Sequence, residues 1–414
     1  MTRIPKRSLN ALARGFTLVE VMIAMLIGVI GVVVIMQTFA VSEGFKRTAT
    51  SGTDAQINGG IAIYMLQREM RMAGFGMNSL MAQGCPSVRM YKSTVSTGYD
   101  LPLVPFMINP PLVPAGDANT DTMLIAYGTS DSFVSGITLV TSQANAAAPF
   151  QLVSNYDSFQ NGDIFVSVMP GAGPGGAASC VMHEATATWS AAGNCGYPPS
   201  SGVQGMLEHG QVSYQKHTPT GCVATTSTFN NGTGITTSGG TVVPTCAYPT
   251  CQVYGLGDAA IHVYAIRGGN LTMCDWIASD CTNAANYNII VNDIVSLRGV
   301  YGMNLTPNVT SLPGDGVVTW NRNNLTSNVF LPSRVMAATI EVTARNSLKE
   351  KPTSGTTCDA TPTATRPDKS MDWIYQSMAG AGIDLSTASS DWNCYRYRLF
   401  QTSVPLRNMI WRPT

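Results

Sequence analysis

A single carboxylate interrupts the first long apolar segment of the chain. The run from Phe16 to Val41 carries no charge other than that of Glu20. A carboxylate inside a membrane costs roughly 2.5–3.5 kcal/mol at the middle of a spanning helix, and less toward the end of the span. Because this cost has to be offset, we expect the Glu20 carboxylate to pair with a cation.

The cysteines are the second set of residues whose chemistry can be read. All 10 lie between Cys85 and Cys394, and an even number in the later part of the chain fits complete pairing in an oxidising compartment. The connectivity does not follow from the sequence. Proximity favours three pairs, Cys274–Cys281, Cys180–Cys195 and Cys358–Cys394, and leaves Cys85, Cys222, Cys246 and Cys251 open.

Two patterns have a weak resemblance to metal sites. Cys246 and Cys251, with His262, could supply zinc ligands, but the chain has no C-x2-C pair and the setting is oxidising, which disfavours zinc. Asp117-Ala-Asn119-Thr-Asp121 begins like a calcium loop, yet Gly128 stands where a bidentate glutamate would be needed. A turn before a strand is the better interpretation, and calcium near Asp117 stays an open alternative.

No residue pattern predicts catalysis. The histidines are scattered, and His183-Glu184 lacks the second histidine of a metalloprotease helix. The sequence also has no G-x-S-x-G, no phosphate-binding glycine loop and no dinucleotide-binding pattern. We therefore predict a protein that is not an enzyme and requires no cofactor.

The charges are few and balanced. Lys and Arg together number 24, Asp and Glu also number 24, and only 12% of the residues are charged. A nucleic-acid surface depends on clustered basic residues, so we expect no nucleic-acid partner. Lys and Glu are scarce while Gly, Ser, Thr, Asn and Pro are abundant, which favours strands and long loops over helices.

The N-terminus has the features of a membrane-inserted segment. Residues 1–15 contain four basic residues and no acid, and such a segment stays on the cytoplasmic side. Residues 16–41 are long enough as a helix to cross a hydrocarbon layer of ~30 Å. An ordinary secretory signal would place a small-residue cleavage site after this run, and Phe39–Glu43 offers none. The bulk of the chain is therefore expected on the periplasmic side of the inner membrane.

The junction between these two segments resembles a known motif. Gly15-Phe16-Thr17-Leu18-Val19-Glu20 is similar to the prepilin motif of type IV filament proteins. The resemblance implies that prepilin peptidase cuts after Gly15 and that the new terminus, Phe16, is N-methylated. Its ammonium could then pair with Glu20 of a neighbouring subunit. Two such charges at ~4 Å attract by about 4 kcal/mol at an effective dielectric constant of ~20.

Six further segments resemble PilW-type minor pilins. This resemblance implies a tip complex that primes the type IV pilus, contains other minor pilins, the major pilin and a PilY-type tip adhesin, and supports twitching motility and adhesion. The alternatives are a J-type pseudopilin of type II secretion and an adhesin that binds surfaces directly. The segments are residues 67–75, 121–128, 161–168, 294–304, 335–345 and 404–408.

The same sequence predicts an α+β fold in which one N-terminal helix precedes a β-rich domain. We expect residues 42–75 to continue the helix, with a break near residues 42–54, because Gly44, Gly52 and the Gly59-Gly60 pair each cost ~1 kcal/mol. Alternating apolar residues predict strands in residues 76–414, which we assign to the globular domain. Two polar, glycine-rich insertions, Pro170–Ser179 and Thr225–Thr245, are expected to be long loops held by disulfides.

Overall fold

The structure is a computed structural model of the chain. Most of the expected leader, residues 1–14, and most of the predicted loop Thr225–Thr245, residues 232–244, lie outside the residues that it describes. The described residues are 15–77, 85, 87–92, 98–102, 104–129, 136–173, 178–189, 193–196, 198–200, 202–227, 229–231, 245–303, 319–321, 335–350, 352, 358–361, 384–387 and 389–410.

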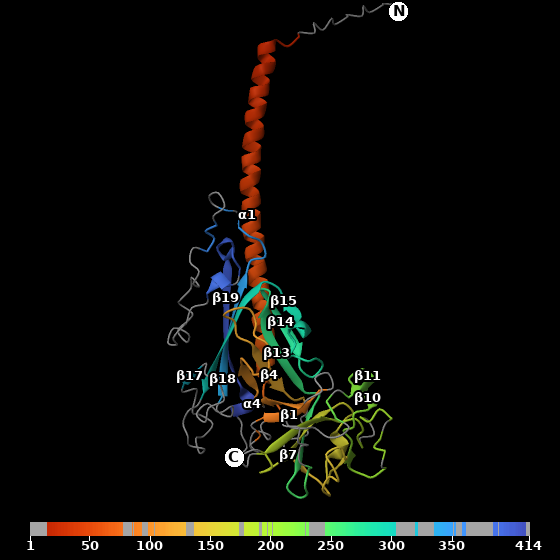
Figure 1. Cartoon of the computed structure of the whole chain (residues 1–414). Helices are drawn as coiled ribbons and strands as arrows, with labels where there is room; N and C mark the ends of the chain where they lie inside the picture. The colour runs from red at the N-terminus through yellow and green to blue at the C-terminus, as the bar shows by residue number, and fades with distance from the viewer. Residues whose placement is uncertain are drawn as a thin grey trace, which may run out of the picture.

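One helix dominates the N-terminal part of the molecule. Helix α1 runs from Leu18 to Met72, a length of 55 residues, and its first half projects free of the rest of the protein (Figure 1). The break predicted near residues 42–54 is wrong, because α1 continues through this stretch. Thr53 Oγ1 donates to Ala49 O at 3.0 Å inside the helix. A glycine penalty of ~1 kcal/mol is small beside the cooperativity of a helix that is long on both sides.

The strands of the described residues form three sheets and two short ribbons. The six-stranded sheet has the order β2-β1-β8-β7-β12-β5, the five-stranded sheet β15-β14-β13-β4-β3, and the four-stranded sheet β17-β16-β18-β19. The six strands of the first are β1 Ser87–Tyr91, β2 Gly98–Pro102, β5 Ile137–Thr138, β7 Ile164–Met169, β8 Ser179–Glu184 and β12 Gln252–Gly257. The second sheet comprises β3 Phe106–Ile108, β4 Met123–Tyr127, β13 Ala260–Arg267, β14 Asn270–Asp275 and β15 Asn288–Val291.

The other strands form the four-stranded sheet and the two ribbons. The four-stranded sheet consists of β16 Ile294–Met303, β17 Thr319–Asn321, β18 Val335–Arg345 and β19 Tyr397–Pro405. The ribbons pair β10 Ser213–Thr218 with β11 Gly221–Thr226, and β6 Phe150–Gln151 with β9 Met206–Leu207. The short helices are α4 Arg407–Ile410 and the 3-10 turns Tyr156–Ser158, Ala284–Asn286, Leu385–Thr387 and Trp392–Cys394.

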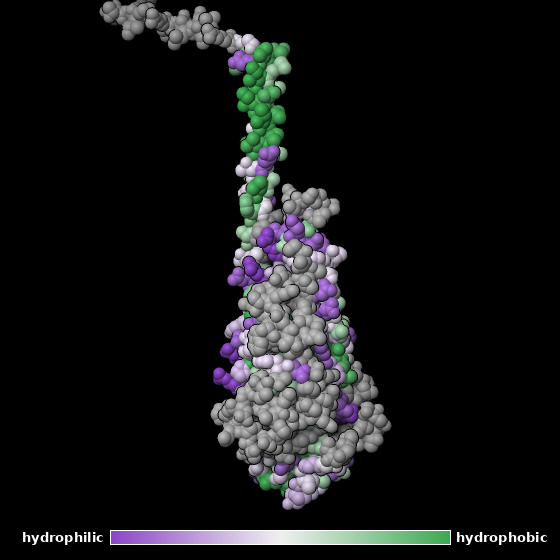
Figure 2. All heavy atoms as spheres, turned by 90° about the vertical axis from the view of Figure 1, so that its left-hand side faces the viewer, coloured by the Kyte–Doolittle hydropathy of each residue, from purple (hydrophilic) through white to green (hydrophobic). Residues whose placement is uncertain are grey.

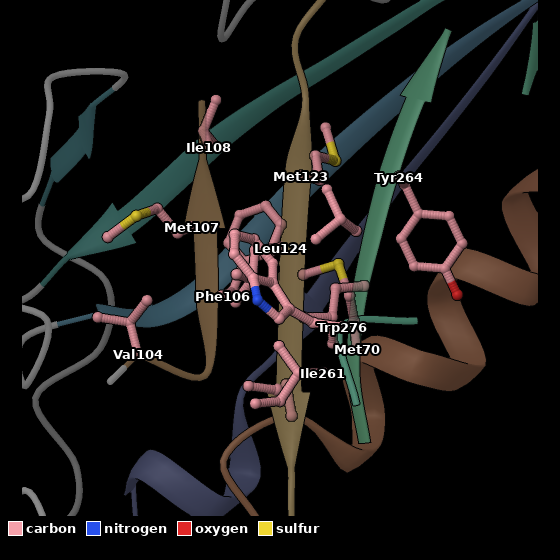
Figure 3. Packing of buried hydrophobic residues seen from close by; sticks show 14 of the residues in the cluster. Met70, Val104, Phe106, Met107, Ile108, Met123, Leu124, Ile261, Tyr264 and Trp276 are labelled. Carbon is pink, nitrogen blue, oxygen red and sulfur yellow. The ribbon is translucent and has the colours of Figure 1, made fainter. Parts of the chain in front are cut away.

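The β-rich domain contains a main core and a distal core. The main core joins the second half of α1 to the five- and four-stranded sheets, and Figure 3 shows Met70 of α1 beside Trp276 and β4. The distal core lies at the end of the molecule away from the N-terminus, where β7 is labelled in Figure 1. Strand β7 is buried along its whole length because Val166 points into the main core while Phe165 points into the distal core.

Five disulfides hold the domain together, and the predicted α+β fold is confirmed. The structure contains two of the pairs expected from proximity, Cys274–Cys281 and Cys358–Cys394. The expected pair Cys180–Cys195 is wrong, because β1 lies beside β8 and this brings Cys85 to Cys180, 95 residues away. The remaining bonds are Cys195–Cys222 and Cys246–Cys251.

Candidate processing and assembly site

The predicted cleavage junction lies immediately outside α1. Gly15, Phe16 and Thr17 precede the helix, and the backbone of Thr17 is extended, with φ −75° and ψ 151°. A side chain added at Gly15 would meet nothing within 4 Å. The peptide bond after Gly15 is therefore accessible and lies outside the helical hydrogen-bond pattern, as a protease substrate requires.

Thr17 begins the helix, and the sequence analysis missed this role. Its hydroxyl accepts a hydrogen bond from the Glu20 backbone N–H at 3.3 Å, so it is the N-cap residue. The signal was present, because Thr17-x-x-Glu20 is the spacing of a capping box. Glu20 consequently lies in the first turn, where the helix dipole favours a negative charge.

Glu20 is part of an exposed apolar column. The segment Leu18–Lys46 is long and apolar enough to cross a membrane, with a mean hydropathy of 2.9. None of the segment is buried against the rest of the chain, and Phe16 and Leu18 are exposed by 80% and 76%. Figure 2 shows hydrophobic side chains covering the upper part of the helix. This segment fits membrane anchoring before assembly.

The second half of α1 has one buried and one exposed apolar stripe. Leu66, Met70 and the small residues Ala55, Gly59, Ala62 and Ala73 face the β-rich domain. The opposite stripe, which we call the outer ridge, consists of Ile57, Ile61 and Tyr64, exposed by 53%, 46% and 65%. The outer ridge follows the free half of the helix and is a second apolar surface available to other subunits.

Gly59 permits a close contact between α1 and β19 of the four-stranded sheet. A methyl group at Gly59 would lie 1.9 Å from Phe400 Cε2 on β19. At the adjacent Gly60, the same group would meet nothing within 4 Å. The two neighbouring glycines thus form a matched pair, of which only Gly59 is required by packing.

We expect Gly59→Ala to destabilise the protein and Gly60→Ala to stabilise it. Alanine gains ~1 kcal/mol of helix propensity over glycine at either position. At Gly59 this gain is exceeded by overpacking against Phe400, which costs about 1–3 kcal/mol. Thermal unfolding of both full-length variants in detergent micelles measures the difference. Equal shifts in the two midpoints would show that α1 does not pack on β19 as described.

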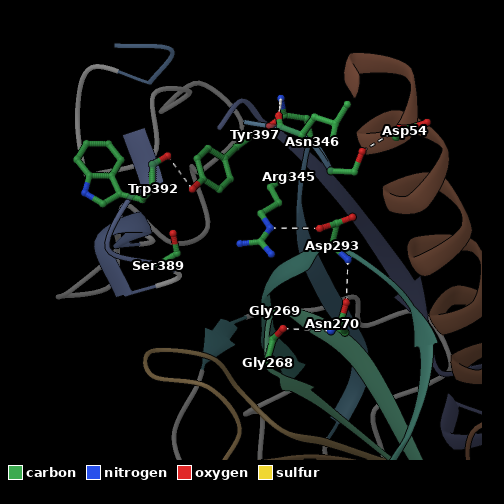
Figure 4. A network of polar contacts seen from close by, with 12 residues as sticks. Asp54, Gly268, Gly269, Asn270, Asp293, Arg345, Asn346, Ser389, Trp392 and Tyr397 are labelled. Atoms are coloured by element: carbon green, nitrogen blue, oxygen red, sulfur yellow. Dashed lines mark hydrogen bonds and ion pairs between the residues drawn. The ribbon is translucent and has the colours of Figure 1, made fainter. Parts of the chain in front are cut away.

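Two ion pairs hold elements of the domain together. One joins α1 to β13, and the other joins the end of β18 to the turn before β16. Glu69 Oε2 of α1 pairs with Nδ1 of His262 on β13 at 2.8 Å. Burial lowers the pKa of His262, but the hydrogen bond and the negative charge of Glu69 raise it further, so that the pKa lies above its ordinary value. At the end of β18, Arg345 Nε pairs with Asp293 Oδ1, just before β16, at 3.3 Å (Figure 4).

The C-terminal segment closes the other end of α1. The side-chain amide of Asn408 donates to the backbone carbonyls of Met72 and Ala73, each at 3.1 Å. Leu406 is fully buried, and its N–H donates to Met336 O at 2.8 Å. These contacts give residues 404–408, one of the segments that resemble minor pilins, a structural role as the cap of the helix C-terminus.

Neither of the two possible metal sites is arranged for a cation. Asp117 accepts hydrogen bonds from the backbone N–H groups of Gly268 and Gly269 at 3.0 and 2.8 Å, so it fastens a turn. Asp121 pairs with Arg298 at 3.6 Å. The zinc alternative is wrong because Cys246 and Cys251 are bonded to each other.

Two histidines share the distal core. The rings of His183 and His209 lie 4.6 Å apart, and His209 Nε2 lies 2.9 Å from Ala148 O. Burial lowers the pKa of His209 to about 4. Burial and the charge of His209 lower the pKa of His183 well below its ordinary value. Both rings are therefore neutral at neutral pH, and they pack as apolar groups against Phe150 and Phe165.

We expect acid to loosen the distal core selectively. A histidine whose pKa is lowered by folding contributes stability that is complete above its unfolded pKa and is lost as the pH falls below it. With a folded pKa of about 4, His209 alone should cost about 2 kcal/mol between about pH 7.5 and about pH 5. Hydrogen exchange of residues 150–209 measures the loss, which His209→Leu should reduce.

His262→Gln is the matched control for this acid response. Because the pKa of His262 is raised, its contribution is present at low pH and lost as the pH rises through the folded pKa, which is the opposite sign. The substitution should weaken helix docking at low pH and leave the exchange of the distal core unchanged. A distal core whose exchange ignores pH would contradict the burial of the two rings.

One comparison with known proteins identifies the N-terminus. A family model described as the prokaryotic N-terminal methylation motif matches residues 11–36. No curated protein and no solved structure matches the chain. The matched residues contain the Gly15–Phe16 junction, the Thr17 cap and Glu20. The motif supports a type IV pilin-like protein, either a pilin or a pseudopilin, that a prepilin peptidase processes and that assembles with other pilins.

Proposed function

We propose that this chain is a minor pilin of the PilW type, located in the tip complex that initiates a type IV pilus. The observation that carries the proposal is the methylation motif at the start of a helix that leads into a large β-rich domain. The free half of α1 supplies the filament core, while the bulk beyond it obstructs a continuous shaft. A scarce subunit at the tip tolerates such bulk better than a repeated shaft subunit does.

The proposal assigns a task to each part of the chain. Residues 1–15 are the leader that prepilin peptidase removes, and residues 16–41 anchor the protein in the inner membrane and later enter the filament. Residues 42–75 are the periplasmic continuation of the helix, which packs against the domain, and residues 76–414 form the pilin domain. After cleavage, the methylated ammonium of Phe16 pairs with Glu20 of an adjacent subunit.

The proposed partners follow from the two apolar surfaces. The membrane segment and the outer ridge of Ile57, Ile61 and Tyr64 contact the helices of other minor pilins and the major pilin. The distal end, away from the membrane helix, is where we place a PilY-type tip adhesin. In this position the protein supports assembly, and through it twitching motility and adhesion, without binding a surface itself.

Counting and locating the protein in filaments tests the proposal. We expect a few copies per filament in sheared pili, with immunogold labels at one end, and a loss of piliation in a deletion strain. Labels distributed along the shaft would refute the tip position. Normal pili with defective export of secreted enzymes would indicate a J-type pseudopilin. A purified, processed protein that binds surfaces without pilus partners would indicate a direct adhesin.

A further inference from the structure

The β10–β11 hairpin is held to the body of the protein by one of its strands. The His217 N–H of β10 donates to Asn161 O at 2.7 Å, and Tyr214 OH donates to Glu184 Oε1 at 2.5 Å. Lys216 Nζ pairs with Asp258 Oδ1 at 3.2 Å. The hairpin lies on the flank of the distal end (Figure 1). These contacts make β10 its inner strand.

Strand β11 is the outer strand, and its backbone is available along one edge. Among the described residues it pairs only with β10. In an antiparallel pair, every second residue points its N–H and C=O away from the partner strand. The His217 N–H points away from β11, and His217 lies opposite Cys222. This pair therefore shows which residues of β11 point their backbone groups outward. Cys222, Ala224 and Thr226 therefore point their backbone groups outward, and no described hydrogen bond occupies these groups.

Among the described residues, this edge lacks the charge, the proline and the bulge that usually prevent strand pairing. Natural edge strands carry lysines, prolines or bulges that block the addition of another strand. The six residues of β11, Gly-Cys-Val-Ala-Thr-Thr, include neither a charge nor a proline. Their pairing with β10 is regular from Gly221 to Thr226, without a bulge. Val223 is exposed by 53%.

The exposed edge is also rigidly positioned. Cys222 is bonded to Cys195, and the Ser227 N–H beyond the end of β11 donates to Val212 O at 3.1 Å. Binding of a partner strand would therefore cost little conformational entropy in β11, because contacts already hold this strand near both of its ends. An unprotected and ordered edge is the template that β-strand addition uses.

We propose that β11 receives a β-strand from a different protein, which extends the ribbon to three strands. The chemistry of β11 defines the donor as an extended, uncharged segment of about six residues without proline. β-Branched or aromatic side chains should lie opposite Val223 and Thr225, and small ones opposite Ala224. The choice of a different protein over a second copy rests on the proposed function. That function places only a few copies of this chain in each filament, so the neighbour of β11 is a different protein.

Photo-cross-linking of the full-length protein in its native cells tests the proposal. A photoreactive phenylalanine analogue is placed singly at Val223, Ala224, Thr225 and Thr226, and the cross-linked residues are located by mass spectrometry. Paired strands advance together by one residue per step. We expect the four cross-linked residues of the partner to follow one another in order along one segment of a single other protein. As a control, the analogue at exposed Val153, far from β11 in sequence, should not reach that segment.

A pair of backbone variants separates strand addition from simple proximity. Ala224→Pro removes one outward N–H, whereas the hydrogen bonds to β10 come from the alternate residues Gly221, Val223 and Thr225. It should lower the cross-linking yield from Thr226 at least about tenfold, which corresponds to ~1.4 kcal/mol. Ala224→Ser retains the N–H and should preserve the yield. Formation of the Cys195–Cys222 disulfide in both variants verifies the fold.

Each outcome decides the proposal. An ordered set of cross-links that Ala224→Pro abolishes supports it. Cross-links to β11 of a second copy, cross-links scattered over several segments, or no cross-links would overturn it. The order of the cross-links is determined in cells, so it does not depend on recovery of the protein in sheared filaments. A protein that lacks filament association but shows the ordered set would therefore refute only the pilus function.

Discussion

Gly15→Asp should leave the protein entirely as uncut precursor in the inner membrane. The junction is outside α1, and the substitution places a charged side chain next to the bond that we propose prepilin peptidase cuts. A pocket that accepts a residue without a side chain rejects such a group by about 100-fold or more. The added negative charge also faces the anionic cytoplasmic leaflet. Immunoblotting and N-terminal sequencing of the membrane fraction measure the outcome.

The structure makes this expectation specific to processing. A Cβ at Gly15 would meet nothing within 4 Å, so the substitution disturbs no packing. Gly60→Asp introduces the same side chain at another open position of the chain, outside the apolar segment, and should be cut normally. Mature protein of normal size from Gly15→Asp, or a failure of Gly60→Asp to mature, would remove the support for cleavage after Gly15.

The helical part could be predicted because its determinants are local. Apolar residues without charge predict a helix of spanning length, and the structure has α1 from Leu18 to Met72. The glycine penalties near residues 42–54 are local too, but they are too small to break the helix. Each is ~1 kcal/mol, and the helix on both sides offsets it. Gly59 shows that a glycine in a helix can also have a packing role. The tertiary contact with Phe400 requires a residue without a side chain at this position.

The disulfides and the distal core could not be predicted because their determinants are not local. The bond between Cys85 and Cys180 depends on β1 lying parallel to β8, a contact that spacing along the chain does not reveal. His183 on β8 and His209 just after β9 are likewise brought together only where the six-stranded sheet meets the β6–β9 ribbon. The sequence shows them only as two isolated histidines, and nothing in their neighbours indicates that both are buried.

Glu20→Val should be cut normally yet be lost from filaments. Valine fits the apolar helix and removes the cost of burying a carboxylate, so insertion and cleavage should not suffer. What disappears is the attraction that we propose between Glu20 and the Phe16 ammonium of an adjacent subunit, which is at most about 4 kcal/mol and is offset in part by desolvation. Even if only ~1.4 kcal/mol of this attraction is left after desolvation, its loss lowers recovery in sheared pili about tenfold.

Glu43→Gln is the control that separates pairing from general charge effects. Glu43 lies on the same helix near the other end of the apolar segment, and its neutralisation should leave recovery unchanged. Glu20→Gln distinguishes the charge from the shape, because it keeps the size of the side chain and the Thr17 cap, which binds the Glu20 backbone. Since a neutral amide cannot pair with an ammonium as a carboxylate does, Glu20→Gln should fail as Glu20→Val does. Full recovery of Glu20→Gln would show that Glu20 acts without its charge and would rule out the ammonium as its partner.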